Sequence, residues 1–340
     1  MSQMTTMTFG EARACARAVL PLKVPLMVWG PPGAGKSALA RRVAADLGIE
    51  RIYDLRGSLL DAVDLRGFPV VRDDGVTHWC APAFLPRPDD GPALLLLDEL
   101  TQSPPPVQAG MLQLFLDRRV GEYALPDDTL ILAAGNRAED RAGVQRLIAP
   151  LLNRMLHVEL AVDPEEWLVW AAGAGVIEEV RATIAYRPEL LFHHDPKEDT
   201  RAFPTPRAWE FASRVYPVTP EGLRWPLLEG TVGRGATAEF MAVVEVRARL
   251  VPVETLLAGA ATVRLPDNPI MLHAQVGQLV EHARRHGDAP TLQALLTLAN
   301  RMPRELSALL VAQAAKVQPA LLVLPEAQPW LARHLHLLKD

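Results

Sequence analysis

One segment, residues 30–37, constrains the fold of this chain more than any other part of its sequence. It matches the pattern G-x-x-x-x-G-K-[ST] at every position. An apolar run, Leu26 to Trp29, leads into it, and a run of helix-forming residues, Ala38 to Val43, follows it. This context predicts a phosphate-binding loop, or P-loop, between a strand and a helix. The loop consists of Gly30, Pro31, Pro32, Gly33, Ala34, Gly35, Lys36 and Ser37.

The residue types in this loop suit the binding of a nucleoside triphosphate. Glycines let successive backbone N–H groups converge on phosphate oxygens at the start of a helix, where the helix dipole also favours anions. Lys36 is expected to neutralise the β- and γ-phosphates, and Ser37 to offer its hydroxyl to Mg²⁺. The expected ligands are therefore ATP and Mg²⁺. The sequence leaves the choice of base open, because contacts to the base are expected from the segment Phe9 to Pro25.

A pair of acids follows the most apolar run of the chain. Leu94 to Leu97 is four leucines long and leads directly into Asp98 and Glu99. A continuous apolar run is typical of a strand that is buried on both faces of a parallel sheet. Asp98 is then expected at the carboxyl end of the strand, where it can hold the Mg²⁺ shell. Glu99 is expected to accept the proton of the attacking water.

A third apolar run, Leu130 to Ala134, ends in Gly135 and Asn136. A polar side chain at the tip of this strand could orient the water beside the γ-phosphate. A Gly-Asn pair is also typical of a plain turn, and the residues alone leave this alternative open.

The distribution of apolar runs predicts the fold class. Short apolar runs alternate with helical stretches up to Leu160, as in an α/β protein with a largely parallel sheet. Beyond Asp163 the periodicity becomes helical. We therefore expect an α/β nucleotide-binding core over residues 1–160, followed over 161–340 by an α-helical lid and a C-terminal helical region. The core is expected to have a parallel five-stranded sheet flanked by helices, with strands at Leu26–Trp29, Ile52–Leu55, Ala93–Leu97, Thr129–Ala134 and Met155–Leu160.

Composition narrows the class of protein. The formal net charge is -5, so nucleic-acid binding is not indicated and would need a local basic patch. The two cysteines are too few for a disulfide framework. No apolar run reaches the length of a membrane span, and residues 1–10 lack the order of a signal peptide. A cytoplasmic protein without a membrane span is expected.

With its three strand-end motifs in this order, the chain resembles the AAA+ ATPases, and within them the MoxR-like branch, close to the dynein-related group. The resemblance covers residues 9–217. It implies that Asn136 is the sensor 1 residue and that Arg154, in the segment Pro150 to Met155, is the finger that reaches the nucleotide of a neighbouring subunit. It also implies that Arg207, in the segment Phe203 to Trp209, is the sensor 2 residue. Asn153 replaces the aspartate that is common in relatives, and Arg137, Arg141 and Arg146 lie close enough in sequence that the choice of Arg154 depends on the resemblance.

Two hairpins are expected in the core. The segment Gly67 to Trp79 has apolar arms around an Asp-Asp-Gly turn, and a second candidate is Gly121 to Thr129. They resemble the two inserts that the MoxR-like branch carries near the central channel of its ring. Two ordinary surface hairpins are the alternative.

The resemblance implies an ATPase that works as a ring-shaped homo-oligomer, expected to be a hexamer, and remodels, assembles or activates a partner complex. Members of the branch often act with a partner that carries a von Willebrand A domain. The alternative within the same fold is a motor subunit of a nucleic-acid processing or restriction-like defence system. A monomeric kinase or nucleotide switch fits less well, because the chain lacks an N-K-x-D motif and because Glu99 suits the activation of water.

Overall fold

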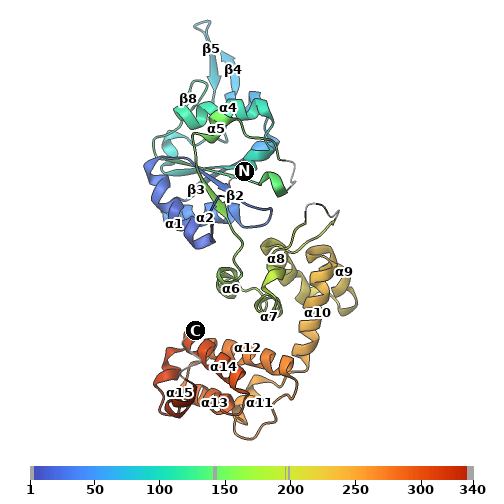
Figure 1. Cartoon of the computed structure of the whole chain (residues 1–340). Coiled ribbons are helices and arrows are strands. Elements are labelled where there is room, and N and C mark those ends of the chain that lie inside the picture. Colours follow the sequence, from blue (N-terminus) through green and yellow to red (C-terminus); the bar gives the residue numbers. More distant parts are fainter. Residues whose placement is uncertain (1–3, 141–143, 196, 198–199, 335–340) are drawn as a thin grey trace. The chain divides into compact units, whose positions relative to one another are not determined.

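The computed structural model describes residues 4–140, 144–195, 197 and 200–334. The chain divides into two compact units, Met1–Ala236 and Thr237–Asp340. Figure 1 shows the sheet in the first unit and only helices in the second. Within the described residues no strand follows Leu160, as the sequence predicts. The predicted division into residues 1–160 and 161–340 falls inside the first unit and stays a prediction.

A parallel sheet forms the centre of the first unit. Its strand order is β1-β10-β2-β9-β6-β3, and every neighbouring pair is parallel. All five predicted strands are confirmed, but the predicted number of five is wrong because the sheet has six strands. The extra strand, β1, is only two residues long and has no apolar run of its own; it pairs Met7 with Leu160 at the sheet edge. The strands are β1 Thr6–Met7, β2 Leu26–Trp29, β3 Arg51–Arg56, β6 Ala93–Asp98, β9 Thr129–Gly135 and β10 Leu156–Leu160.

Helices cover both faces of this sheet, which explains why its central strands are continuously apolar. The helices α1 (Phe9–Val19) and α2 (Lys36–Asp46) contribute to the core on one face, with Leu39 and Val43 fully buried. The helices α4 (Pro105–Asp117) and α5 (Ala149–Leu152) contribute to the core on the other face. All residues from Ala93 to Leu97 are buried. Sheets of this kind bind ligands at the carboxyl ends of their strands.

Two hairpins interrupt the core. The first is confirmed: β4 (Phe68–Val71) pairs antiparallel with β5 (Thr77–Cys80) around a turn in which Gly75 has a φ of +72°. It extends away from the sheet in Figure 1. The second is shifted from its predicted range of 121–129, because β7 (Arg119–Val120) and β8 (Tyr123–Ala124) turn at Gly121, whose φ is +57°. Only the second arm of this hairpin lies in the predicted segment.

The remaining helices follow the sheet strands or lie beyond them. Within the described residues, no helix has both the length and the apolar character needed to cross a bilayer. The remaining helices of the first unit are α3 Ala62–Arg66, α6 Pro164–Gly173, α7 Glu178–Tyr186, α8 Pro206–Val215 and α9 Glu221–Val232. Helix α10 crosses the boundary between the two units. This helix and those that follow it are α10 Arg234–Ala248, α11 Val253–Ala258, α12 Pro269–Arg285, α13 Ala289–Ala299, α14 Arg304–Val317 and α15 Ala327–His334. Short 3-10 helices lie at Leu20–Leu22, Gly57–Leu59, Pro88–Asp90, Leu100–Gln102, Ala138–Asp140, Pro188–Leu191, Tyr216–Val218 and Pro319–Val323.

The second unit has an apolar core of its own. Residues of α12, α13 and α14 form most of this core, among them Leu279, Leu296 and Leu310. The fully buried Trp330 of α15 packs there, and its indole N–H donates to the hydroxyl of Ser307 at 2.8 Å. A buried indole that keeps its hydrogen bond adds apolar contact without leaving an unpaired donor.

Candidate nucleotide-binding site

The P-loop connects β2 to α2 as the sequence predicts. Gly33 and Gly35 have φ angles of +78° and +98°, which residues with a Cβ rarely adopt. Gly35 is the N-cap residue of α2 and offers no side chain to its first N–H groups. Those donors therefore remain available at the positive end of the helix dipole, where an anion binds well.

Lys36 is buried at the start of α2. Its Nζ donates to the carbonyl oxygens of Gly30 at 2.8 Å and Pro31 at 2.9 Å, and to Oδ1 of Asn136 at 2.8 Å. Burial lowers the pKa of the Lys36 amine to about 8, although the nearby carboxylate of Asp98 opposes this shift. The lysine thus joins the P-loop to the tip of β9.

Ser37 and Asp98 meet at the neighbouring position. The Ser37 hydroxyl donates to Oδ2 of Asp98 at 2.6 Å, and Oδ1 of Asp98 accepts the N–H of Glu99 at 2.9 Å. A hydroxyl and a carboxylate side by side are the oxygen ligands that Mg²⁺ prefers. Both the donor set and the adjacent lysine therefore fit a magnesium-bound triphosphate.

Glu99 follows Asp98 in an unusual backbone conformation. Its φ of +54° and ψ of 31° are left-handed, which turns the chain sharply after β6 and into the 3-10 helix Leu100–Gln102. Its side chain accepts a hydrogen bond from the hydroxyl of Ser58, which follows β3. The two carboxylates have different partners, Ser37 for Asp98 and Ser58 for Glu99, so the two acids can have different roles.

Asn136 is buried at the end of β9. Its backbone N–H donates to Oγ1 of Thr101 at 3.0 Å, while its side chain accepts from Lys36. Thr101 is fully buried in the turn after Glu99. Asn136 is therefore bonded to the P-loop through its side chain and to the turn after Glu99 through its backbone, and it is buried, unlike a residue of a plain surface turn.

The close packing at this strand tip predicts the effect of a minimal substitution. A Cβ on Gly135 would lie 2.5 Å from Cγ2 of Thr101 and 2.7 Å from Cε of Met27. We expect Gly135→Ala to lower the free energy of unfolding by about 1–3 kcal/mol, as overpacking of a filled core does. Denaturant unfolding of the two variants measures this change. The control is Gly173→Ala, where nothing lies within 4 Å of the new Cβ and stability should be unchanged or raised. Equal effects of the two variants would contradict the packing argument.

Arg137, beside Asn136, is held by several acids. Its guanidinium donates to Asp140 at 2.8 Å and to Glu159 at 3.0 Å, and the hydrogen bond to Asp140 raises the pKa of Arg137 further above its usual range. The Arg137 guanidinium is thus fully engaged with acids of its own chain. Arg146 is exposed, and Arg141 lies outside the described residues.

Arg207 lies on the first turn of α8, next to the P-loop. Thr205 caps this helix by accepting the N–H of Ala208 at 3.0 Å, and it packs so closely on Gly33 that a Cβ there would lie 2.8 Å from its side chain. The exposed Arg207 is near enough for its charge to help lower the pKa of Lys36. The predicted sensor 2 segment and the P-loop are therefore brought together.

Arg154 lies apart from this cluster. It is half-buried in the turn after α5, where Nη1 donates to the carbonyl oxygen of Pro150 at 2.7 Å. Among the described hydrogen bonds and ion pairs, none joins Arg154 to the P-loop or to the acids after β6.

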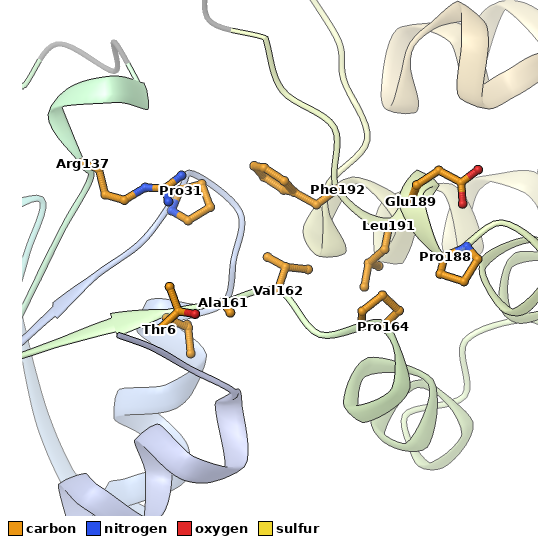
Figure 2. A pocket seen from close by; sticks show the side chains of 11 residues that line it. Thr6, Pro31, Arg137, Ala161, Val162, Pro164, Pro188, Glu189, Leu191 and Phe192 are labelled. Carbon is orange, nitrogen blue, oxygen red and sulfur yellow. The ribbon is translucent and has the colours of Figure 1, made fainter. Parts of the chain in front are cut away.

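A cavity lies beside Pro31 of the P-loop. It has a volume of about 360 Å³, and apolar side chains such as Val162, Leu191 and Phe192 form much of its lining, with Pro31 of the P-loop on the opposite wall (Figure 2). Thr6 of β1 also lines it. An apolar cavity beside a phosphate loop suits a nucleoside base. The predicted segment for base contacts, 9–25, contributes none of the lining residues.

The sequence did not predict two side chains of this site, Ser58 and Thr101, or the cavity beside the P-loop. Ser58 and Thr101 have no motif of their own. The contact between the turns after β3 and β6 brings Ser58 to Glu99, and the contact between the turn after β6 and the end of β9 brings Thr101 to Asn136. The cavity was missed because its lining residues come from segments far apart in the chain.

One family model matches the part of the chain that contains the P-loop, the two acids and Asn136. Residues 25–155 match the AAA domain of the dynein-related subfamily. This matched AAA segment contains the P-loop, Asp98, Glu99, Asn136 and Arg154, whereas Arg207 lies beyond it.

Comparisons with curated proteins and with solved structures give no further assignment of function. No curated protein matches the sequence. NtrX from Brucella abortus in complex with ADP is 15% identical, with 99% of this chain and 70% of that chain covered and a TM-score of 0.40. A putative ATPase from Cytophaga hutchinsonii is 15% identical over 95% of this chain and 80% of its own, with a TM-score of 0.36. The Holliday junction branch migration motor RuvB of Thermotoga maritima is 16% identical over 96% and 93%, with a TM-score of 0.35. In another NtrX structure this chain spans 66% of the matched chain. Structural similarity at this level carries no argument about activity.

Proposed function

We propose that this protein binds ATP with Mg²⁺ and hydrolyses it. The observation that carries the proposal is the hydrogen-bonded cluster at the carboxyl ends of β2, β6 and β9. In it Lys36 bonds to Asn136, and Ser37 bonds to Asp98. Side chains whose chemistry suits phosphate, Mg²⁺ and water thus lie together at one edge of the sheet.

Each side chain has a role that its chemistry supports. The loop N–H groups and Lys36 bind the phosphates, and Ser37 and Asp98 hold Mg²⁺, which offsets negative charge on the phosphate oxygens when bound. Glu99 accepts the proton of the attacking water, and its bond to Ser58 orients the carboxylate. Asn136 orients that water. Arg207 approaches the γ-phosphate of its own chain, and the cavity beside Pro31 accepts the base.

We further propose a ring-shaped homo-oligomer of the MoxR-like type, expected to be a cytoplasmic hexamer, that remodels, assembles or activates a partner protein complex. Arg154 has no acidic partner among the described ion pairs and lies apart from its own chain's cluster, which suits a finger that reaches a neighbour's nucleotide. The β4–β5 hairpin exposes Phe68 and Val71, by 79% and 70%, which suits contact with a client protein. A protein with a von Willebrand A domain is the proposed partner type.

Assembly is the direct test of the ring. We expect a slowly hydrolysed ATP analogue to raise the molar mass at micromolar protein, because an arginine that acts across an interface gains its charge-assisted bonds only when the γ-phosphate is present. Light scattering with and without the analogue measures the mass. A mass that stays that of one chain would refute the ring while leaving nucleotide binding intact.

The shifted pKa of Lys36 predicts proton uptake on nucleotide binding. Above pH 8 the amine is largely neutral in the free protein, because burial lowers its pKa to about 8. Phosphate oxygens favour the charged form and raise the pKa again, so binding near pH 9 should take up at most about one proton, and binding well below pH 8 should take up none at this group. Calorimetry in buffers of different ionisation enthalpy measures the uptake.

Lys36→Arg is the matched control for this uptake, because a guanidinium keeps its proton at this pH. The uptake near pH 9 should disappear in this variant, at protein concentrations that still give a binding signal. An unchanged uptake would assign the proton to another group.

A further inference from the structure

One imidazole ring joins the strand before the P-loop to the turn that carries Arg154. Trp29 is the last residue of β2, and its indole N–H donates to Nδ1 of His157 at 3.0 Å. The other ring nitrogen of His157, Nε2, bonds to the carbonyl oxygen of Leu152 at 2.8 Å. Leu152 ends α5, two residues before Arg154.

The partners of this ring fix its protonation. An indole N–H can only donate, so Nδ1 of His157 must be the acceptor and carry no proton. A carbonyl oxygen can only accept, so Nε2 must carry the proton and donate. The ring is therefore a neutral tautomer with a donor on one side and an acceptor on the other, and both of its nitrogens are used.

The turn that carries Arg154 ends in a long backbone hydrogen bond, which shares its acceptor with His157. The N–H of Arg154 reaches the carbonyl oxygen of Leu151 at 3.2 Å, and the N–H of Met155 reaches that of Leu152 at 3.4 Å. The bond from His157, at 2.8 Å, is much shorter than the second of these. His157 itself is on β10, inside the sheet, where it pairs with Met27 of β2. It therefore ties the end of this turn to a strand that is paired within the sheet.

We propose that His157 is a positioning residue that holds Arg154 for the nucleotide of a neighbouring subunit and ties that position to the P-loop strand of its own subunit through Trp29. The inference rests on the proposed function, in which Arg154 acts in trans. His157 contacts no phosphate in this role. It acts through the Leu152 carbonyl, and Trp29 keeps the imidazole in the tautomer that donates to that carbonyl.

Two amide substitutions separate the two bonds. In His157→Asn the side-chain oxygen lies near the place of Nδ1, so the acceptor for Trp29 is kept and the bond to Leu152 is lost. In His157→Gln the longer amide reaches the place of Nε2 and can donate to Leu152, while the acceptor for Trp29 is lost. If holding the Arg154 turn is the role of His157, glutamine should replace it better than asparagine.

The experiment places His157 variants in one partner of a mixed assembly. Glu99→Gln chains supply a finger and no working pocket, and Arg154→Ala chains supply a pocket and no finger, so the mixture hydrolyses ATP only where a pocket meets a neighbour's finger. We expect His157→Asn in the Glu99→Gln chains to lower the recovered rate about two- to tenfold, the effect of one hydrogen bond. The same substitution in the Arg154→Ala chains should leave the recovered rate unchanged. His157→Gln in the Glu99→Gln chains should restore most of the loss.

The other possible results of this mixing experiment contradict different parts of the proposal. If His157→Asn lowers the recovered rate equally in the Glu99→Gln and the Arg154→Ala chains, the substitution causes a general structural defect and the positioning role is overturned. If the loss is confined to the Glu99→Gln chains, equal unfolding midpoints of the variants exclude poor folding as its cause. No loss in either arm overturns the role of His157 alone. If the mixture without any His157 substitution recovers no activity, the trans finger fails and this inference fails with it. Trp29→Phe keeps an aromatic ring but loses the N–H donor. In the Glu99→Gln chains it should lower the recovered rate, and in the Arg154→Ala chains it should leave that rate unchanged. An equal loss of rate in both cases overturns the link to the P-loop strand.

Discussion

Arg154→Ala is expected to leave ATP binding nearly intact and to lower ATP hydrolysis strongly. Arginine fingers that act in trans in other P-loop enzymes contribute about 10³ to 10⁵ to the rate, which is the upper guide for this variant. The physical reason is that a guanidinium stays charged and bridges phosphate oxygens as negative charge develops on them. Binding of a fluorescent nucleotide and steady-state ATPase assays measure the two quantities separately. Arg146→Ala, a change of an exposed arginine eight residues earlier in the chain, is the control and should keep full activity.

A mixture of two inactive variants decides whether this arginine acts in trans. Arg154→Ala and Glu99→Gln chains, once subunit exchange is confirmed, form some interfaces that pair an intact pocket with an intact finger. Those interfaces should hydrolyse ATP, so the rate of the mixture should exceed the sum of the separate rates. A finger that acts within its own chain predicts a strictly additive rate, because every chain then lacks one of its own two groups.

Glu99→Gln is expected to bind ATP normally and to hydrolyse it about 10²- to 10⁴-fold more slowly, which is the usual contribution of a general base. Glutamine has the shape of the acid but cannot accept the proton of the attacking water. The hydrogen bond from Ser58 can still form to the amide oxygen, so the loss reports proton transfer and not a displaced turn.

Glu50→Gln is the matched control for this substitution. Glu50 is exposed and directly precedes β3, at the sheet edge opposite the proposed site, so this change should leave the rate unchanged. Turnover of the Glu99→Gln variant at the normal rate would remove Glu99 from the mechanism. The same variant should also retain a partner longest, which makes it the form in which to look for the client.

The sequence determined the parts of this protein that depend on neighbours in the chain. The P-loop could be predicted because glycines at fixed spacing, a lysine and a serine adopt one local geometry, and the positive φ angles of Gly33 and Gly35 agree with it. The strand Ala93–Asp98 could be predicted because a run of leucines is buried on both faces of a parallel sheet. The first hairpin followed from the turn at Gly75. The carboxyl ends of such strands meet at one edge, which placed Asp98 and Asn136 near Lys36 in advance.

Only the tertiary structure decided which side chains meet across the sheet. The strand order β1-β10-β2-β9-β6-β3 is not the order in the sequence, so no local pattern tells that Trp29 lies beside His157 or that Ser58 reaches Glu99. Strand β1 is too short to leave an apolar signal, since its two residues gain their hydrogen bonds only from the edge of β10. The cavity beside Pro31 likewise exists only where β1, the P-loop and the helices after β10 come together. Local sequence fixes backbone conformation and burial, whereas hydrogen bonds between distant segments depend on how the sheet and its helices pack.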